Sequence, residues 1–383
     1  MKKILMSQVS IDREGIQLPW LFKLKKIESL GCRISIYGTY FLEKLCLTGT
    51  DVYTFNDSFP KLKWFYKKKW TKSMVMYQAL KKNIVAILTY RKYIRDEFDI
   101  IYSPASVLDL IIFPYFLKLF GNKIKWVTVL DNTVPLFLEK KFISGNKFLR
   151  ILAWIFFRVS LLLLRRADCI FVVKSELKTY LEERGFSENK IVVTGNGVEI
   201  NLIKRARRDT NFTYDAIFVG RINEAKGIYD LLKVIEIIKK SYPDFQLAIM
   251  GEGDIATKTK FRKKISNSNL SKNIHFLGYI TGQKKFDILK SSKCFLCLSE
   301  TESLPVAPLE AVCSGLPTFV YNLDAFEMYR NNEVIISPKY NVGSVAEKVL
   351  DLFQKGNFEN KNGQMLLDRY SWERIAEIEF SVI

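Results

Sequence analysis

Histidine and closely spaced cysteines are scarce in this sequence of 383 residues. It has one histidine, His275, and six cysteines, of which only Cys294 and Cys297 form a CxxC pattern. Two residues three apart on a strand face opposite sides of the sheet, and no second pair supplies the remaining ligands of a zinc site. We therefore expect no metal site, a histidine satisfied within the core, and six buried reduced thiols: Cys32, Cys46, Cys169, Cys294, Cys297 and Cys313.

Long uncharged hydrophobic runs are also missing. No window of about 18 apolar residues lacks a charge, so we expect no transmembrane helix. The three apolar residues after Met1-Lys2-Lys3 are too few for a secretory signal, and we expect a cytoplasmic protein. The most apolar segment, residues 148–164, is interrupted by Arg150 and Arg158. It predicts a core helix, with an interfacial helix as the alternative.

Positive charge is abundant and unevenly distributed. The net charge is +19, and residues 1–200 hold 33 basic against 18 acidic side chains, so the N-terminal half should meet something anionic. Within it, residues 61–72 interleave lysine with Trp, Phe and Tyr. This pattern fits an interfacial membrane contact at the cytoplasmic face of the membrane, a surface for single-stranded nucleic acid, or a solvated loop whose aromatic rings enter the core.

Short apolar runs alternate with helical patterns along the whole chain. A strand at 4–9, a loop containing Gly15 and a helix at 18–30 open it, in the order of a Rossmann-like βαβ unit. After a polar stretch, residues 204–213, the alternation restarts with a strand at 216–219. The sequence therefore predicts an α/β protein of two doubly wound domains joined near residue 205, with a ligand at the carboxyl ends of the strands.

The segment 299–317 carries the most informative pattern. It predicts a loop with Glu302 and then a helix that begins at Pro305, carries Glu310 and ends before Gly315. The helix start would offer free N–H groups to a phosphate, and the two carboxylates flank it. They lie about 12 Å apart by helical rise, which exceeds the 5–9.5 Å of glycosidase pairs. A nucleotide-sugar fits this arrangement, and a capped surface helix with solvated acids is the alternative.

A second segment, residues 220–227, follows the strand at 216–219. Its sequence GRINEAKG lacks the Walker order and places Arg221 and Lys226 where doubly wound folds hold phosphate. A guanidinium can clamp a diphosphate with two hydrogen bonds, and an ammonium adds a point charge. Two solvated loop cations are the alternative. Asp131, which follows a buried strand at 126–130, is expected to face the same cleft.

Five segments together carry a resemblance to a known family. They are NGV (196–198), FVGRINEAKG (218–227), LAIMGEGD (247–254), IHFLGYI (274–280) and SETESLPVAPLEAVCSGLP (299–317). In this order they resemble the retaining glycosyltransferases of family 4. The likeness is dense over residues 165–383. It implies the GT-B fold, in which two Rossmann-like domains, here 1–204 and 205–366, face a deep cleft and a last helix, within 367–383, crosses back to the first domain.

The resemblance also implies roles for individual residues. Arg221 and Lys226 would bind the donor diphosphate, Glu302 the hydroxyls of the donor sugar, and Glu310 the ribose. Asp131 stands where many members have a histidine and would hold the sugar or the acceptor. Ser303-Leu304-Pro305 replaces the usual Gly-Phe-Gly. The remaining donor contacts would come from Gly15, Gly220, Gly251, Gly278, Tyr279, Ser303, Leu304 and Val306.

The expected activity is the retaining transfer of a hexosyl unit from a nucleotide-sugar to a glycan or lipid-linked acceptor. The family implies catalysis without a metal or other cofactor, through Arg221, Lys226, Glu302 and Asp131. Two alternatives remain open. One is a GT-B epimerase or phosphorylase, and the other is a basic nucleic-acid-binding protein, against which the paired carboxylates argue.

Overall fold

The chain divides into two compact units, each built on its own parallel sheet. The computed structural model describes residues 2–9, 23, 26–38, 51–54, 83–88, 91, 98–121, 123–134, 147–208, 213–302, 305–327, 329 and 333–383. One unit comprises Met1–Gly195 and Glu373–Ile383, and the other Asn196–Trp372.

The first unit has a seven-stranded sheet in the order β3-β2-β1-β4-β5-β6-β7, and every neighbouring pair in it is parallel. Strands β4 and β6 are short apolar runs in which every residue is buried, as is usual in parallel sheets. The elements are β1 (Lys3–Val9), β2 (Arg33–Gly38), β3 (Asp51–Thr54), β4 (Ile100–Ser103), α4 (Leu108–Phe120), β5 (Lys125–Leu130), α5 (Lys147–Leu164), β6 (Cys169–Val172), α6 (Ser175–Glu182), a 3-10 turn (Glu188–Lys190) and β7 (Ile191–Val193).

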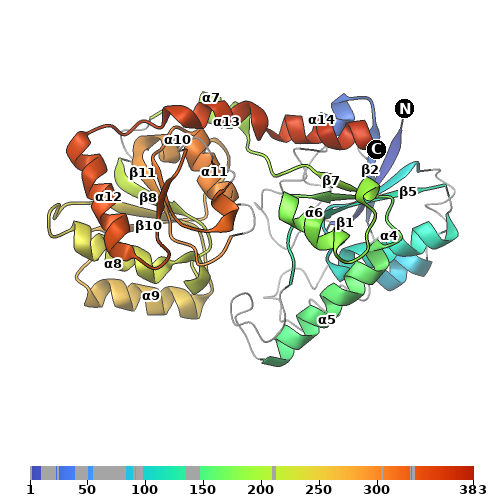
Figure 1. The fold of residues 1–383 in the computed structure, drawn as a ribbon, viewed down its shortest axis with the longest axis horizontal. Coiled ribbons are helices and arrows are strands. Elements are labelled where there is room, and N and C mark those ends of the chain that lie inside the picture. The colour runs from blue at the N-terminus through green and yellow to red at the C-terminus, as the bar shows by residue number, and fades with distance from the viewer. Residues whose placement is uncertain are drawn as a thin grey trace. The chain divides into compact units, whose positions relative to one another are not determined.

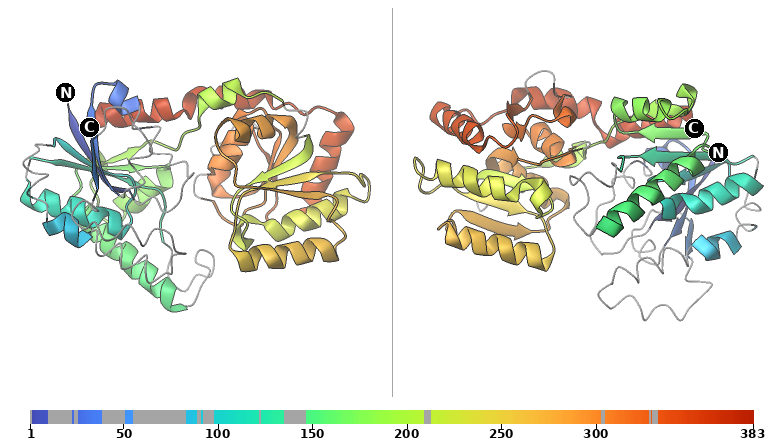
Figure 2. Two further views of the ribbon diagram at one scale, coloured as in Figure 1. Left: turned by 180° about the vertical axis from the view of Figure 1, so that it is seen from behind. Right: turned by 60° about the horizontal axis from the view of Figure 1, so that its bottom comes forward.

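The C-terminal helix α14 (Trp372–Val382) is part of this first unit. Ala376 and Ile383 are buried in the same cluster as Ile4 and Ile34 from the sheet. The Lys2 ammonium donates to the carbonyl oxygen of Ile383 at 2.8 Å, which fixes the end of the chain beside β1 (Figures 1 and 2).

The second unit has a six-stranded parallel sheet in the order β10-β9-β8-β11-β12-β13. Helices connect most of its strands, as parallel pairing requires. The elements are α7 (Ile200–Arg205), β8 (Tyr214–Val219), a 3-10 turn η5 (Glu224–Lys226), α8 (Ile228–Ile238), β9 (Leu247–Met250), α9 (Ile255–Asn267), β10 (Ile274–Gly278), α10 (Gly282–Ser291), β11 (Ser292–Cys297), α11 (Val306–Cys313), β12 (Thr318–Tyr321), two further 3-10 turns (Asp324–Phe326 and Lys361–Gly363), β13 (Ile335–Ser337), α12 (Val342–Lys355) and α13 (Gln364–Arg369).

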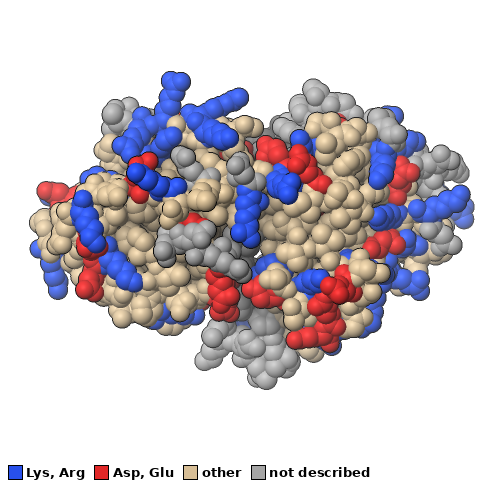
Figure 3. Space-filling view, turned by 45° about the horizontal axis from the view of Figure 1, so that its top comes forward, with Lys and Arg blue, Asp and Glu red and all other residues tan. Residues whose placement is uncertain are grey.

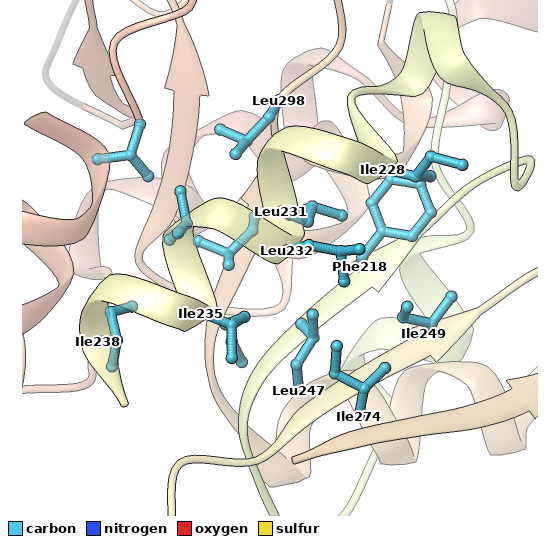
Figure 4. Close-up of a cluster of buried hydrophobic side chains, with 14 of the residues drawn as sticks. Phe218, Ile228, Leu231, Leu232, Ile235, Ile238, Leu247, Ile249, Ile274 and Leu298 are labelled. Carbon is cyan, nitrogen blue, oxygen red and sulfur yellow. The ribbon is translucent and has the colours of Figure 1, made fainter. Parts of the chain in front are cut away.

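Both faces of the second sheet are covered by helices. On one face α8, α9 and α12 pack on the strands through a cluster that includes Phe218, Leu231 and Leu247 (Figure 4). On the other face α7, α10, α11 and α13 form a second cluster. Cys294 belongs to the first cluster and Cys297 to the second, so the two thiols face opposite sides of β11, as predicted. The five described cysteines are free and buried, and Cys46 lies outside the described residues.

The division between the units lies earlier than the sequence suggested. The predicted linker began at Lys204, but Lys204 belongs to α7. The Gln283 side chain of α10 donates to the carbonyl oxygen of Leu202 at 3.0 Å, and Ile203 is buried with α10. Lys204 and Arg205 therefore form the exposed end of a short packed helix of the second unit, and the division falls at 195/196.

Candidate functional site

The strand order of the second sheet reverses between β8 and β11. Ligands of doubly wound sheets bind at such a switch point, at the carboxyl ends of the strands. The segments that leave β8 and β11 at this edge are residues 220–227 and 298–305. They are also the two segments that the sequence singled out, so the topology places both predicted motifs at one position of the sheet.

The two segments are in direct contact. The Glu300 N–H donates to the carbonyl oxygen of Ala225 at 2.9 Å. Gly227 has φ 70°, and a Cβ at this position would lie 1.8 Å from the carbonyl oxygen of Leu298. Glycine is therefore required here both for its left-handed conformation and for the close approach of the two backbones.

This contact brings Lys226 and Glu302 together. The Lys226 ammonium lies 2.5 Å from Glu302 Oε1, and the side chains are 24% and 9% exposed. Asn223 fixes the start of η5, since its side chain accepts a hydrogen bond from the Lys226 N–H at 3.0 Å. Cys297 lies beside the pair, with Sγ 3.9 Å from Glu302 Oε1. Burial, reinforced by the charge of Glu302, raises the pKa of the Cys297 thiol to about 11.

Arg221 lies at the opposite end of the same loop from Lys226. It follows Gly220 directly after β8, and its side chain is exposed. Among the residues that the structure describes, no carboxylate forms an ion pair with its guanidinium, whereas Lys226 is paired with Glu302. The loop therefore offers one exposed cation and one that is already partnered.

Glu310 is the second predicted carboxylate, and it is buried. It lies in α11, only 6% exposed, with both carboxylate oxygens 2.5 Å from the ammonium of Lys285 on α10. Lys285 was not predicted as a site residue. It is one of two adjacent lysines in an ordinary amphipathic helix, and only the packing of α10 beside α11 reveals its role.

The helix α11 is close to the predicted one. It begins at Val306, with Pro305 as the N-cap residue rather than the first helical residue. It ends where predicted, because Gly315 has φ 84°. The N–H groups of Gly315 and Leu316 donate to the carbonyl oxygens of Val312 and Ala311, which is a Schellman motif.

Three of the predicted glycines line the same edge of the sheet. Gly251 has φ 151°, and a Cβ there would lie 1.9 Å from the carbonyl oxygen of Gly220. The Gly251 N–H donates to the carbonyl oxygen of Gly278 at 2.8 Å. The ends of β8, β9 and β10 are thus joined through Gly220, Gly251 and Gly278. Tyr279, which follows Gly278, is 54% exposed.

Gly15, Ser303 and Leu304 are outside the described residues. Asp131 belongs to the first unit, where it follows β5. Its side chain keeps solvent-accessible surface. Desolvation by the surrounding protein nevertheless raises the pKa of its carboxyl. The negative charge of Glu379 raises this pKa further, whereas the positive charge of Lys23 lowers it. Within the described part of the chain, no cluster of three or more His, Cys, Asp and Glu side chains is placed to hold a metal ion.

A buried polar cluster, also missed from the sequence, lies in the first unit near Asp131. The Lys23 ammonium donates to Glu379 Oε1 at 2.7 Å and to the Tyr102 hydroxyl oxygen at 3.0 Å, and Tyr102 donates to Glu379 Oε2 at 2.8 Å. These side chains are almost fully buried. Glu379 comes from α14, so the cluster ties the C-terminal helix to the first unit.

Comparison with known families identifies the chain. Residues 50–202 match the family described as Glycosyltransferase Family 4, and residues 202–365 match Glycosyl transferases group 1. The two matches meet at residue 202 and together span residues 50–365, which include most of each unit. The chain belongs to the group 1, family 4 type of glycosyltransferases. The predicted family is confirmed, and the retaining outcome that was predicted with it stays a prediction.

Curated relatives match this glycosyltransferase over part of its length. An uncharacterized glycosyltransferase of Methanocaldococcus jannaschii is 32% identical over 39% of the chain and 39% of its own length. The poly(ribitol-phosphate) alpha-N-acetylglucosaminyltransferase of Staphylococcus aureus is 27% identical, over 46% of the chain and 37% of its own length. The phosphatidyl-myo-inositol mannosyltransferase of Mycobacterium tuberculosis is 24% identical, over 47% and 50%. The chain thus spans between about two fifths and half of the length of these relatives.

Solved structures match the glycosyltransferase over its whole length. TarM of S. aureus is similar with a TM-score of 0.72 at 14% identity, covering 100% of this chain and 98% of TarM. HepE of Anabaena, in complex with UDP-glucose, is similar with a TM-score of 0.70 at 13% identity, with the same coverage. At these identities the likeness shows the fold. The predicted α/β, GT-B class is therefore confirmed.

Proposed function

We propose that this glycosyltransferase moves a hexosyl unit from a nucleotide-sugar to an acceptor hydroxyl with retention of configuration, in the synthesis of a cell-surface glycan or glycolipid. The observation that carries the proposal is the contact between Lys226 and Glu302 at the switch-point edge of the second sheet, in a loop that also presents the exposed Arg221. Cations there suit a diphosphate, and carboxylates suit the hydroxyls of a sugar and a ribose. The UDP-glucose bound by HepE supports a donor of this class.

In the proposed reaction the bond between the sugar carbon and the diphosphate breaks, and its electron pair leaves with the diphosphate. The acceptor oxygen forms the new bond on the same face, and its proton passes to a phosphate oxygen of the donor. Arg221 and Lys226 stabilise the negative charge that develops on the leaving group. Because these two cations supply that stabilisation, we propose that the enzyme needs no metal or other cofactor.

Donor binding must rearrange the pair that the structure shows. Lys226 is held by Glu302 at 2.5 Å, so an arriving diphosphate competes for the ammonium and releases carboxylate oxygens to accept hydrogen bonds from sugar hydroxyls. Glu310 holds the ribose, with Lys285 keeping its carboxylate in place. Asp131 of the first unit holds the sugar or the acceptor, and the exposed Tyr279 lies by the base.

The acceptor is proposed to be a glycan or a lipid-linked saccharide. The mannosyltransferase relative is named for phosphatidyl-myo-inositol, and the N-acetylglucosaminyltransferase relative for poly(ribitol-phosphate). If the acceptor is lipid-linked, the enzyme acts at the cytoplasmic face of a membrane. The predicted contact through Lys61 to Lys72 lies outside the described residues. Among the described helices, none has the length and hydropathy needed to cross a bilayer.

The proposal is tested with a panel of nucleotide-sugars. A donor that binds the native state raises the melting temperature by mass action, with about 2.7 kcal/mol of added stability at a hundred times its dissociation constant. The anomeric configuration of the product, measured by NMR, must equal that of the donor. An epimerase or phosphorylase would give no glycosidic product from that donor.

A nucleic-acid-binding protein is the candidate from another class. Figure 3 shows acidic side chains interspersed with the basic ones over the face that it draws, so the excess charge does not form one continuous basic surface there. Salt-sensitive binding to an oligonucleotide without any effect of nucleotide-sugars would favour this candidate and contradict the proposal.

A further inference from the structure

Helix α5 (Lys147–Leu164), labelled in Figure 1, exposes apolar side chains in its C-terminal half. Three of them follow one another at spacings of four and three residues, which places them on one face of a helix. We call this set the α5 stripe: Ile155, Val159 and Leu162, with side chains 42%, 36% and 64% exposed.

The opposite face of α5 is packed into the first unit. Phe157, Leu161 and Leu164 are 8%, 6% and 1% exposed, and the Phe157 ring lies 6.3 Å from that of Tyr180. The helix is thus fixed by its inner face, and the stripe is a stable feature of the outside. Soluble proteins seldom leave a large contiguous apolar patch uncovered unless it binds something.

The charges on α5 itself and on the two residues that follow it have one sign. The α5 sequence contains no Asp or Glu, and Arg165 and Arg166 follow it directly. Arg158, Arg165 and Arg166 are exposed, and the Arg158 guanidinium lies 5.8 Å from the centre of the Trp154 ring. At 100° per residue, Arg158 and Arg165 flank one side of the stripe and Arg166 lies at its C-terminal end.

We propose that the α5 stripe docks on the surface of an anionic lipid bilayer, with the helix lying in the plane of the interface. Apolar side chains then enter the boundary of the acyl chains while the arginines contact lipid phosphates. At about 1.5 Å per residue, the stripe from Ile155 to Leu162 on α5 is about 10 Å long. This surface is distinct from residues 61–72.

Charge complementarity selects this occupant over a second copy of the chain. A symmetric dimer through the stripe would bring two sets of arginines together, with no acidic residue from either α5 to offset them. An anionic bilayer satisfies both the apolar stripe and the arginines. The biological role of this docking rests on the proposed lipid-linked acceptor. The vesicle-binding experiment that tests the docking does not depend on that acceptor.

The test is flotation of the full chain with vesicles of phosphatidylcholine, or of equal parts phosphatidylcholine and phosphatidylglycerol, at low and high salt. We expect binding to the anionic vesicles that weakens with salt. The double variant Ile155→Gln, Leu162→Gln keeps helix propensity and should bind about tenfold more weakly, since apolar area no longer leaves water. The variant Arg158→Gln, Arg166→Gln should lose the preference for anionic lipid.

The matched control is Ile255→Gln, Met365→Gln, which changes two apolar side chains of the second unit that are 70% and 71% exposed. It should bind vesicles as the wild type does. Thermal melting and donor hydrolysis should be unchanged in all three variants, which separates this inference from the proposed function. The inference is overturned if the wild type does not float with anionic vesicles, if the Ile155, Leu162 variant floats equally well, or if that variant instead converts a dimer to a monomer in sedimentation.

Discussion

Lys226 and Glu302 are 76 residues apart in the sequence, and their side chains meet at 2.5 Å. One comes from the segment after β8 and the other from the segment after β11, at the point where the strand order reverses. Gly227 and the hydrogen bond from Glu300 to Ala225 hold the two segments together. The cation and the carboxylate proposed to contact opposite ends of a glycosyl diphosphate are thus partners before any donor arrives.

The first prediction concerns Gly227. Gly227→Ala should destabilise the protein by more than the about 1–2 kcal/mol that a left-handed alanine costs, because its Cβ would lie 1.8 Å from the carbonyl oxygen of Leu298. Gly356→Ala is the matched control, since Gly356 has φ 66° and nothing within 4 Å of the added Cβ. Urea unfolding measures both. Equal losses of unfolding free energy in the two variants would show that the segments after β8 and β11 are not in close contact at Gly227.

The second prediction concerns Lys285. Lys285→Met removes the charge that partners the buried Glu310 carboxylate and should weaken nucleotide binding about tenfold, in line with an interaction of about 1.4 kcal/mol. Lys284→Met is the control, because Lys284 is the exposed neighbour on the same helix. Calorimetric titration with UDP measures both. Wild-type affinity for UDP in Lys285→Met would show that Glu310 does not bind the ribose.

The third prediction concerns the buried cluster of the first unit. Glu379→Ala leaves the Lys23 ammonium buried without its carboxylate and should cost about 3–5 kcal/mol of unfolding free energy. The double variant Lys23→Met, Glu379→Leu removes both charges and should recover much of that loss. Urea unfolding by circular dichroism compares them. A double variant no more stable than Glu379→Ala would show that packing of α14, rather than the ion pair, dominates.

The fourth prediction concerns pH. Burial raises the pKa of Cys297 to about 11 and that of Cys169 to about 11, from an ordinary value of 9.0. Because the thiolate is the nucleophile, both thiols should resist iodoacetamide at pH 8 until the chain is unfolded.

The same shift sets the sign of the pH dependence of stability. The folded state keeps these protons to higher pH than the unfolded chain does, so stability should fall as the pH rises from about 9 to about 11. Substitution of both residues by alanine should reduce the slope of this part of the profile, and the raised pKa values of Cys294 and Cys313 should maintain the rest. Rapid alkylation of the native protein at pH 8 would contradict the assignment.

Much of the fold follows from local sequence patterns. The strands at β8, β9 and β11 are apolar runs bounded by glycine or polar residues, and Gly315 ends α11 as its position predicts. The charged residues of the segment 204–213 suggested a linker, although Lys204 and Arg205 belong to the helix α7. The spacing of Ile200 and Ile203 is the signal that would have indicated the packed helix α7.

The candidate site was less accessible from the sequence. Arg221, Lys226, Glu302 and Glu310 were identified from their motifs, and their contacts with a donor stay predictions. The pairing of Lys226 with Glu302 depends on which strands are neighbours in the sheet, and that of Lys285 with Glu310 depends on helix packing. Neither contact leaves a pattern in the chain, and the same holds for Lys23 and Glu379, which are 356 residues apart.

The central claim is that Arg221 and Lys226 hold the donor diphosphate. It is tested most directly by titrating the best-stabilising nucleotide-sugar into wild type, Arg221→Ala, Lys226→Ala and the control Lys240→Ala, an exposed lysine beyond the far end of α8. We predict at least a tenfold loss of affinity and no measurable transfer in the first two variants. Melting of the unliganded protein should be unchanged in Arg221→Ala and lowered in Lys226→Ala, where Glu302 loses its partner, and the control should behave as the wild type. Wild-type affinity and transfer in either Arg221→Ala or Lys226→Ala would contradict the account.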